Sequence, residues 1–373
     1  MPNLFTPFLL VLSSVILVPA LAFAAGEAEF GSNGEKNGYG KIGVYELSKG
    51  NVSMKLTNWG ATVMSLVLPD KHGKLTDVVL GFDSAFEYKN DTSYFGSIVG
   101  RVANRIANAR FKLNGVLYKL VPNEGKNMLH GGPKGFSDLA WKVIKYKNGG
   151  RTPHIVFGYN SCDGEEGFPG NLEVAVTYKL IGDDRLSVMM KGKALDKPTP
   201  VNLAQHTYWN LGGHNSGDIL SNKVQIFAHS ITPVDSHLIP TGKIVPIKGT
   251  PYDFLRPRTV GSRIQELTSG YDINYVIDGA GGERRMRKTA TVHCERSGRV
   301  MELWTNQPGV QFYTSNALGD TRGKGGYVYK KHAGLCLETQ KFPDSVNHPN
   351  FPSEIVYPGK PYLHLMLYKF STV

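Results

Sequence analysis

The chain has 373 residues, of which 41% are apolar and 20% are charged, and its formal net charge is +11. This composition can bury a large hydrophobic core and excludes a disordered or fibrous chain. The 43 glycines and 21 prolines supply many turns, which favours an all-β protein. Sandwiches of this length occur as one unit, and we expect a single domain over residues 25–373.

The N-terminal segment Met1–Ala24 contains no Lys, Arg, Asp or Glu and carries the apolar runs Phe8–Leu12 and Val15–Val18. Together with the small-x-small pattern of Ala22-Phe23-Ala24, it predicts a signal peptide over residues 1–24, although the usual positive side chain is missing. The alternative is an uncleaved anchor. No other stretch approaches membrane-spanning length, so we expect no membrane span in a secreted mature chain.

On a secretory route, two sequons, at Asn51 and Asn90, would be acceptors of N-linked glycans. The three cysteines, Cys162, Cys294 and Cys336, are an odd number and lack the spacing of metal ligands. We therefore expect small buried residues rather than a disulfide framework, and no structural zinc.

The basic excess raises the possibility of an acidic partner. The densest run is Arg284–Lys288, which has no interleaved aromatic residues and follows the glycine-rich turn Gly279–Gly282. It predicts a solvated loop rather than a nucleic-acid-binding site. Attraction to an acidic polysaccharide matrix remains an expectation.

Alternation of apolar and polar residues is the main secondary-structure signal, and helical periodicity is weak. The clearest strand runs from Leu172 to Leu180, and the turn Gly182-Asp183-Asp184 leads into Leu186–Met190, which predicts an antiparallel hairpin. Further strands are expected at Thr289–Cys294, Val300–Trp304, Gly309–Thr314 and Tyr362–Phe370. The pattern predicts one large sandwich of antiparallel sheets.

An acidic residue interrupts one apolar strand. In Gly334–Gln340, alternation places Leu335 and Leu337 on one face and Glu338 on the other, together with Cys336. A carboxylate is costly to bury there unless it is hydrogen-bonded or has a function, whereas on a solvated face it is ordinary.

Two segments combine histidine with residues suited to a sugar. Val201–Gly213 contains His206 among aromatic rings, which can cover the C–H faces of a pyranose, and amides, which can pair with hydroxyls. Asn127–Gly132 places His130 beside two glycines where backbone could approach a ligand closely. A structural histidine and a simple turn are the alternatives.

Eight segments, in this order along the chain, resemble the motifs of the aldose 1-epimerase family: Gly100–Ile106, Leu129–Gly132, His206–Leu211, Ile239–Gly242, Gly249–Phe254, Tyr271–Tyr275, Pro308–Thr314 and Leu337–Gln340. The resemblance covers nearly all of the chain from about Gly40 to Tyr368. It implies a large antiparallel β-sandwich of the galactose-mutarotase type, with the site in a cleft on one sheet.

The resemblance also implies roles for individual residues. Glu338 resembles the general base of the family and His206 its general acid. The residues that resemble its sugar-holding positions are Asn104, Arg105, His130, Asp272 and Gln311. Trp209 stands where many relatives have phenylalanine and could enlarge an aromatic platform. The leader is the main departure, because many relatives are cytosolic.

The implied reaction exchanges the α and β anomers of a free aldohexose such as glucose or galactose. It removes the proton of the C1 hydroxyl and protonates the ring oxygen, so one base and one acid suffice and neither metal nor nucleotide cofactor is needed. With ordinary pKa values of about 4.3 and about 6.5, Glu338 and His206 would suit these roles without extreme tuning.

Three other functions remain open. A hexose-6-phosphate 1-epimerase would need a basic phosphate clamp beside the sugar, and the secretory leader argues against it. A non-catalytic carbohydrate-binding protein would lack the acid or the base. A glycosidase could use Glu338 and Asp272, but its mechanism needs a carboxyl group as the acid, and here His206 resembles the acid.

Overall fold

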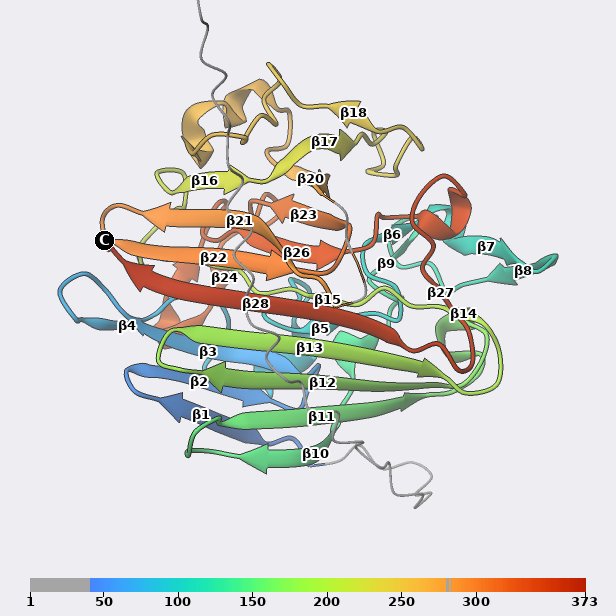
Figure 1. The fold of residues 1–373 in the computed structure, drawn as a ribbon, viewed down its shortest axis with the longest axis horizontal. Coiled ribbons are helices and arrows are strands. Elements are labelled where there is room, and N and C mark those ends of the chain that lie inside the picture. Colours follow the sequence, from blue (N-terminus) through green and yellow to red (C-terminus); the bar gives the residue numbers. More distant parts are fainter. Residues whose placement is uncertain (1–40, 280–281, 283) are drawn as a thin grey trace, which may run out of the picture. The chain divides into compact units, whose positions relative to one another are not determined.

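The computed structural model describes residues 41–279, 282 and 284–373, all of which belong to the compact unit Tyr39–Val373. The predicted leader and Ala280 and Gly281 of the glycine-rich turn lie outside these residues. The described residues form strands, turns and short 3-10 helices and contain no α-helix, which confirms the all-β prediction (Figure 1). In this part of the chain we find no helix with the length and hydrophobicity needed to cross a membrane.

The largest sheet has nine antiparallel strands and extends across the view of Figure 1. Its order is β10 (Lys142–Lys147), β11 (His154–Ser161), β12 (Leu172–Ile181), β13 (Arg185–Ala194), β28 (Tyr362–Thr372), β22 (Arg299–Thr305), β21 (Arg287–Cys294), β16 (Lys223–Ile226) and β19 (Arg258–Thr259).

Two further antiparallel sheets complete the main architecture. The five-stranded sheet has the order β18 (Val245–Pro246), β17 (Ala228–Thr232), β20 (Asp272–Ile277), β23 (Gly309–Tyr313) and β26 (Cys336–Gln340). The four-stranded sheet has the order β1 (Val44–Lys49), β2 (Val52–Thr57), β3 (Thr62–Pro69) and β4 (Leu75–Asp77).

Short elements connect these sheets. The two-stranded pairs are β5 (Ile98–Val99) with β15 (Ala204–Gln205), β6 (Arg105–Ile106) with β9 (Met128–Leu129), β7 (Arg110–Leu113) with β8 (Val116–Lys119), β14 (Thr199–Pro200) with β27 (Ile355–Val356), and β24 (Thr321–Arg322) with β25 (Val328–Tyr329). The 3-10 helices are η1 (Glu87–Asn90), η2 (Ala107–Ala109), η3 (Phe136–Asp138), η4 (Glu165–Gly167), η5 (Val260–Ser262), η6 (Ile264–Glu266), η7 (Lys324–Gly326) and η8 (Ser345–Asn347).

One hydrophobic core joins the three large sheets. It includes Val176 of β12, Leu66 of β3, and Phe312 of β23, all of which are buried. Burial of each such side chain contributes about 1.5–3 kcal/mol, so the large core accounts for most of the driving force for folding. The predicted sandwich of antiparallel sheets is confirmed.

The predicted hairpin forms as expected. Strand β12 alternates between buried and partly exposed residues along its whole length, and its last residue, Ile181, pairs with Arg185 at the start of β13. Gly182 has φ of +61°, a conformation that glycine adopts without the steric cost of a side chain. The other predicted strands match β21, β22, β23 and β28 to within two residues.

The structure corrects the expectation for the cysteines. Cys294 and Cys336 are buried, but Cys162 is exposed, and all three are unpaired. Cys162 directly follows β11, where the chain leaves the sheet, and its carbonyl oxygen accepts a hydrogen bond from Arg101. Its backbone contributes to the structure and its thiol faces outward.

A buried histidine on β28 makes the fold sensitive to acid. His364 lies next to the hydroxyl groups of Thr339 and Tyr362, at 2.7 and 3.0 Å. Burial lowers the pKa of His364 to about 3, whereas the unfolded chain has a value of about 6.5. Only the unfolded state therefore gains this proton as the pH falls from 6.5, so acid destabilises the fold.

We expect His364→Gln to weaken this acid sensitivity. Between pH 7 and pH 5 the variant should lose about 2 kcal/mol less unfolding free energy than the wild type, because its residue 364 does not titrate. Urea unfolding at both pH values measures the difference. An equal loss in the two proteins would show that His364 does not contribute.

Candidate active site

A cleft of about 1130 Å³ brings together all seven candidate site residues of the sequence analysis. These are Asn104, Arg105, His130, His206, Asp272, Gln311 and Glu338. Three of them lie on adjacent strands of the five-stranded sheet, because Gln311 of β23 pairs with Glu338 of β26, and β20, which begins at Asp272, is the other neighbour of β23. The other four come from connecting segments and short strand pairs.

Glu338 and His206 form a buried pair on the floor of the cleft. Strand β26 is buried along its whole length, with Leu337 in the hydrophobic core, so alternation directs Glu338 to the opposite side as predicted. The Glu338 Oε2 atom lies 3.6 Å from the Nε2 atom of His206. Within the described structure this oxygen is buried and has no hydrogen-bond partner, so it is available to a bound molecule.

Backbone hydrogen bonds hold His206 in place. Its N–H donates to Ser97 at 2.9 Å, and its carbonyl oxygen accepts from the N–H of Gly96 at 3.0 Å. The Nδ1 atom lies 3.8 Å from the sulfur of Cys336, which leaves the Nε2 atom directed toward Glu338. The ring therefore presents one nitrogen to the cleft.

Both groups have strongly shifted pKa values, which corrects the expectation that they need little tuning. Burial raises the pKa of Glu338 to about 8, and the negative charge of Asp272 acts in the same direction, while the positive charge of Arg105 opposes both. Burial lowers the pKa of His206 to about 4. The sequence pattern indicated an inward carboxylate but not how completely both groups lose contact with water.

His130 is fixed as a hydrogen-bond donor. The backbone N–H of Asn104 donates to its Nδ1 atom at 3.1 Å, so the proton of the neutral ring lies on Nε2. Nitrogen and oxygen atoms of His130, His206 and Glu338 lie within 4.8 Å of one another, an arrangement that could hold a metal ion. However, a protonated Nε2 cannot ligate a metal, whereas it can donate to a sugar oxygen.

The glycines after His130 pack against protein rather than against a ligand. A Cβ atom on Gly131 would lie 2.0 Å from the carbonyl oxygen of Gly100, and the residue has φ of +91°. Glycine is therefore required for the close approach of two backbone segments. The backbone at Gly131 does approach another group closely, as predicted, but that group is the backbone of Gly100 and not a ligand. This contact helps to hold the neighbouring His130 in the site.

Asp272 and Gln311 form a second polar pair in the cleft. The side-chain N–H of Gln311 donates to the Asp272 carboxylate at 2.6 Å. Gln340, two residues after Glu338, donates to the Gln311 side-chain oxygen at 3.4 Å. These contacts orient an amide and a carboxylate, both of which can pair with sugar hydroxyls.

Sequence reasoning missed several residues of the cleft and misplaced one. Tyr94 and Tyr208 contact the ring of His206, with centroid distances of 5.9 and 5.2 Å, and both line the cleft. Trp209 was expected to enlarge an aromatic platform there, but its ring packs in the core at 5.0 Å from Tyr368. Strand alternation could have revealed this, because Tyr208 and Trp209 are neighbours and point to opposite sides.

Another missed residue is Glu124, which lines the cleft and forms an ion pair with Arg105. The sequence gives no signal for it, since Asn123-Glu124-Gly125 reads as an ordinary polar turn. Its proximity to Arg105 arises only from the folding of that turn beside β6.

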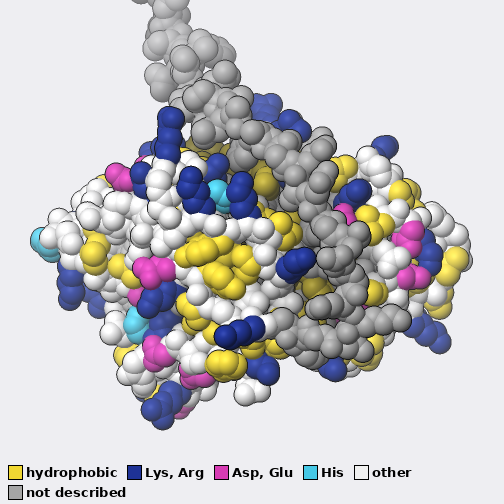
Figure 2. Space-filling model, turned by 90° about the horizontal axis from the view of Figure 1, so that it is seen from below, with side chains coloured by type: hydrophobic (Ala, Val, Ile, Leu, Met, Phe, Trp, Pro, Cys, Tyr) yellow, Lys and Arg dark blue, Asp and Glu magenta, His cyan; other side chains and the backbone are white. Residues whose placement is uncertain are grey.

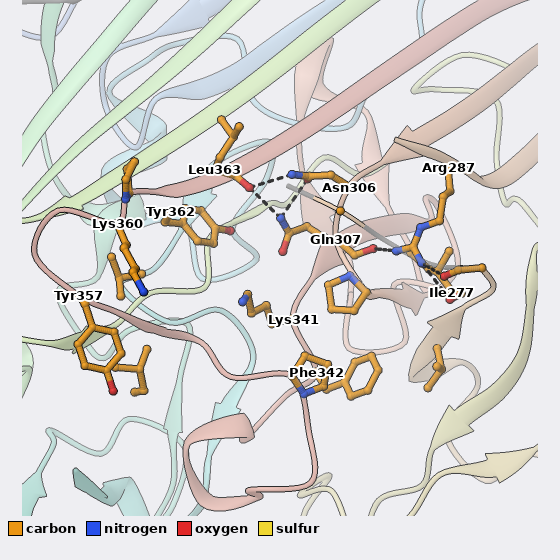
Figure 3. Close-up of a pocket in the computed structure, with 18 of the residues that line it drawn as sticks. Ile277, Arg287, Asn306, Gln307, Lys341, Phe342, Tyr357, Lys360, Tyr362 and Leu363 are labelled. Atoms are coloured by element: carbon orange, nitrogen blue, oxygen red, sulfur yellow. Dashed lines mark hydrogen bonds between the residues drawn. The ribbon is translucent and has the colours of Figure 1, made fainter. Parts of the chain in front are cut away.

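A second cavity, of about 830 Å³, lies at the ends of the strands and is shown in Figure 3. Arg287, from the basic run, donates hydrogen bonds to the backbone oxygens of Gly279 and Gln307 and so ties the loops together. Lys288, also from this run, pairs with Glu302. No residue of the run Arg284–Lys288 lines the cleft. The predicted solvated loop is wrong for Arg287 and Lys288, which begin β21 and are partly buried.

Comparisons with known proteins identify relatives of this chain. The family model of aldose 1-epimerase matches residues 43–369. The galactose mutarotase of Bos taurus is 44% identical over 336 residues, which cover 90% of this chain and 95% of the relative. The aldose 1-epimerase of Escherichia coli K12 is 35% identical over 331 residues, 86% of this chain and 93% of the relative.

The fold is shared with a crystal structure of an aldose epimerase homologue from C. elegans. The TM-score is 0.83 at 29% sequence identity, and the similarity covers 89% of this chain and 100% of the other. The family match, the curated relatives and the shared fold all extend over most of the described residues. The chain therefore belongs to the aldose 1-epimerase family.

Proposed function

We propose that this isomerase interconverts the α and β anomers of free aldohexoses, with Glu338 as the base and His206 as the acid. The observation that carries the proposal is the buried pair itself, with 3.6 Å between Oε2 and Nε2 at the floor of a cleft large enough for a sugar. One acid and one base at this spacing can act on the two oxygens attached to C1.

The proposed reaction moves two protons and breaks one bond. The Glu338 carboxylate accepts the proton of the C1 hydroxyl, and protonated His206 donates its Nε2 proton to the ring oxygen as the bond from C1 to that oxygen breaks. The C1 oxygen becomes the carbonyl oxygen of an open aldehyde. After rotation about C1–C2, the reverse transfers close the ring on the other face.

Burial assists the opening step. Before opening, the pair consists of a carboxylate and an imidazolium; afterwards it consists of a carboxylic acid and a neutral imidazole. Because burial raises the pKa of Glu338 and lowers that of His206, the neutral pair is favoured over the ion pair in this cleft. The positive charge of Arg105 lowers the pKa of Glu338 and so keeps the reactive carboxylate accessible.

The other candidate residues would bind the sugar hydroxyls and retain the open aldehyde. The Nε2 proton of His130 is a donor, while the carboxylate of Asp272 is an acceptor held by Gln311. Asn104 and Arg105 also line the cleft and add an amide and a guanidinium. Fixed donors and acceptors of this kind position the reacting atoms during rotation.

The charges of the cleft favour a neutral sugar over a phosphorylated one. Among its described lining residues the cations are Arg105, which is paired with Glu124, and Lys331. The acidic residues are more numerous: Glu124, Asp235, Glu266, Asp272 and Glu338. Even with Glu338 protonated and Glu124 paired with Arg105, a phosphate group would meet more carboxyl groups than cations and no basic clamp.

Polarimetry tests the activity and its substrate class. Freshly dissolved α-D-glucose and α-D-galactose should reach anomeric equilibrium much faster with the purified protein than in weak buffer alone. Glucose 6-phosphate should be turned over with far lower kcat/KM. Equal or better turnover of the phosphate would favour a hexose-6-phosphate 1-epimerase, and binding without turnover would favour a carbohydrate-binding protein.

The pH profile tests the shared proton. Glu338 and His206 are active only when the two side chains together hold one proton. The profile of kcat/KM against pH should therefore be bell-shaped, with its acidic limb near the His206 pKa of about 4 and its alkaline limb near the Glu338 pKa of about 8. Asp272→Asn removes a charge that raises the pKa of Glu338, so its alkaline limb should move to lower pH. Asp278→Asn, in an ion pair outside the cleft, should leave the limb in place. A shift to higher pH in Asp272→Asn would contradict the assignment.

We also propose secretion, on the basis of the uncharged leader at residues 1–24. Both sequon asparagines, Asn51 and Asn90, are exposed, as glycan attachment requires.

On the face shown in Figure 2, Lys and Arg side chains are scattered among acidic and uncharged ones, and the net charge of +11 supports diffuse attraction to an acidic polysaccharide. N-terminal sequencing of secreted material should begin close to Ala25; a retained Met1 on cytosolic protein would contradict secretion.

A further inference from the structure

Arg105 is held by a carboxylate that the proposed reaction does not use. Its Nε and Nη2 atoms donate to the two carboxylate oxygens of Glu124, each at 2.6 Å. The Arg105 side chain is 10% exposed and that of Glu124 is 35% exposed. Such a two-point contact fixes both the position and the plane of a guanidinium group, which a single contact does not.

Glu124 itself belongs to a rigid turn. Its N–H donates to the carbonyl oxygen of Asn127 at 3.1 Å, and the N–H of Asn127 donates back at 3.0 Å. The side-chain oxygen of Asn127 also accepts a hydrogen bond from the N–H of Asn108 at 2.9 Å. Strand β9 follows at once and pairs with β6, where Leu129 lies opposite Arg105. The carboxylate is therefore attached to the same small sheet as its partner.

The contact with Glu124 leaves the other edge of the guanidinium available. In the described part of the chain no hydrogen bond uses the Nη1 atom of Arg105, although the residue lines the cleft. Burial raises the pKa of both Glu338 and Asp272, and the positive charge of Arg105 opposes each of these shifts. The other titratable groups near Glu338 are His206, His130, the thiol of Cys336 and the hydroxyl groups of Tyr208, Tyr313 and Tyr368.

We propose that Glu124 is a positioning residue of the epimerase reaction. It holds Arg105 so that the Nη1 edge meets a sugar oxygen and the positive charge stays beside Glu338. This inference rests on the proposed function, because it assigns a task to Arg105 in that reaction. Glu124 acts through Arg105 and is not itself a catalytic residue.

Glu124→Gln tests the inference with two readouts. The variant keeps the size of the side chain but loses both charge-assisted contacts, so KM should rise by about 10–100-fold while kcat falls less. If Arg105 moves away, the pKa of Glu338 rises and the alkaline limb of the pH profile moves to higher pH. If Arg105 stays, loss of a negative charge lowers that pKa or leaves it unchanged, and either result overturns the proposal.

The matched control is Glu302→Gln, which removes the carboxylate that pairs with Lys288 on the nine-stranded sheet. The side chains of Lys288 and Glu302 are 30% and 25% exposed, which is similar overall to the exposure of the Arg105–Glu124 pair. It should leave KM and the pH profile unchanged. Glu124→Asp, which keeps the charge on a shorter side chain, should show an intermediate KM and remains informative if the glutamine variant does not fold.

A double-mutant cycle decides whether Glu124 acts through Arg105. In an Arg105→Gln background, the added Glu124→Gln change should alter kcat/KM by less than about twofold, because its target is already absent. An equal loss in both backgrounds would overturn the proposal. Absence of turnover in the wild type would refute the proposed function, whereas an active wild type with an unaffected Glu124→Gln variant would refute this inference alone.

Discussion

Glu338→Gln should reduce turnover by about 10²–10⁴-fold while sugar affinity changes much less. Glutamine keeps the shape of the side chain on β26 but cannot accept the C1 hydroxyl proton. The substitution therefore removes stabilisation of the transition state and has little effect on the binding of the sugar. Polarimetric kcat, combined with calorimetric binding of a hexose, measures the two effects separately.

The matched control for this substitution is Glu354→Gln. Glu354 is as buried as Glu338, at 2% exposure each, and burial likewise raises its pKa to about 8, but it does not line the cleft. A folded Glu354→Gln variant should keep its turnover. Near-wild-type exchange in folded Glu338→Gln would require another base, with Asp272 as the next candidate.

His206→Asn should cause a loss of similar size, because asparagine cannot donate a proton to the ring oxygen. In the double variant with Glu338→Gln, the combined loss should be smaller than the product of the two single losses. Neither proton transfer is useful without the other, since the two side chains share one proton. Single-turnover polarimetry on the three variants measures this coupling.

His364→Asn serves as the control for the histidine. It replaces another buried histidine, whose pKa burial also lowers, but on β28 and outside the cleft. Its turnover should be close to that of the wild type when the protein is folded. Fully multiplicative losses for Glu338 and His206 would indicate that the two groups act independently and would contradict a shared proton.

Much of the framework could be predicted from the sequence, because strands follow a period of two residues. The hairpin of β12 and β13 and the inward direction of Glu338 both come from this period and are both present. The same rule places Tyr208 in the cleft and Trp209 in the core. The expectation for Trp209 was wrong because its ring packs against Tyr368 in the core, on the side opposite to Tyr208.

Properties that depend on distant segments could not be predicted. The pKa values of Glu338 and His206 reflect how many elements cover them, which no local pattern records. Glu124 and Arg105 are 19 residues apart, and their contact exists only because the turn before β9 folds back. Exposure of Cys162 likewise depends on where the chain leaves β11.

The placement of Asp272, Gln311 and Glu338 on three neighbouring strands has a consequence for how a sugar enters. Neighbouring strands lie about 4.8 Å apart and are held by ladders of backbone hydrogen bonds, so the spacing of these side chains is set before any ligand arrives. The cleft should then accept its substrate as a preorganised surface, with little ordering of the backbone. Segments at the rim can change in length or sequence without altering that spacing.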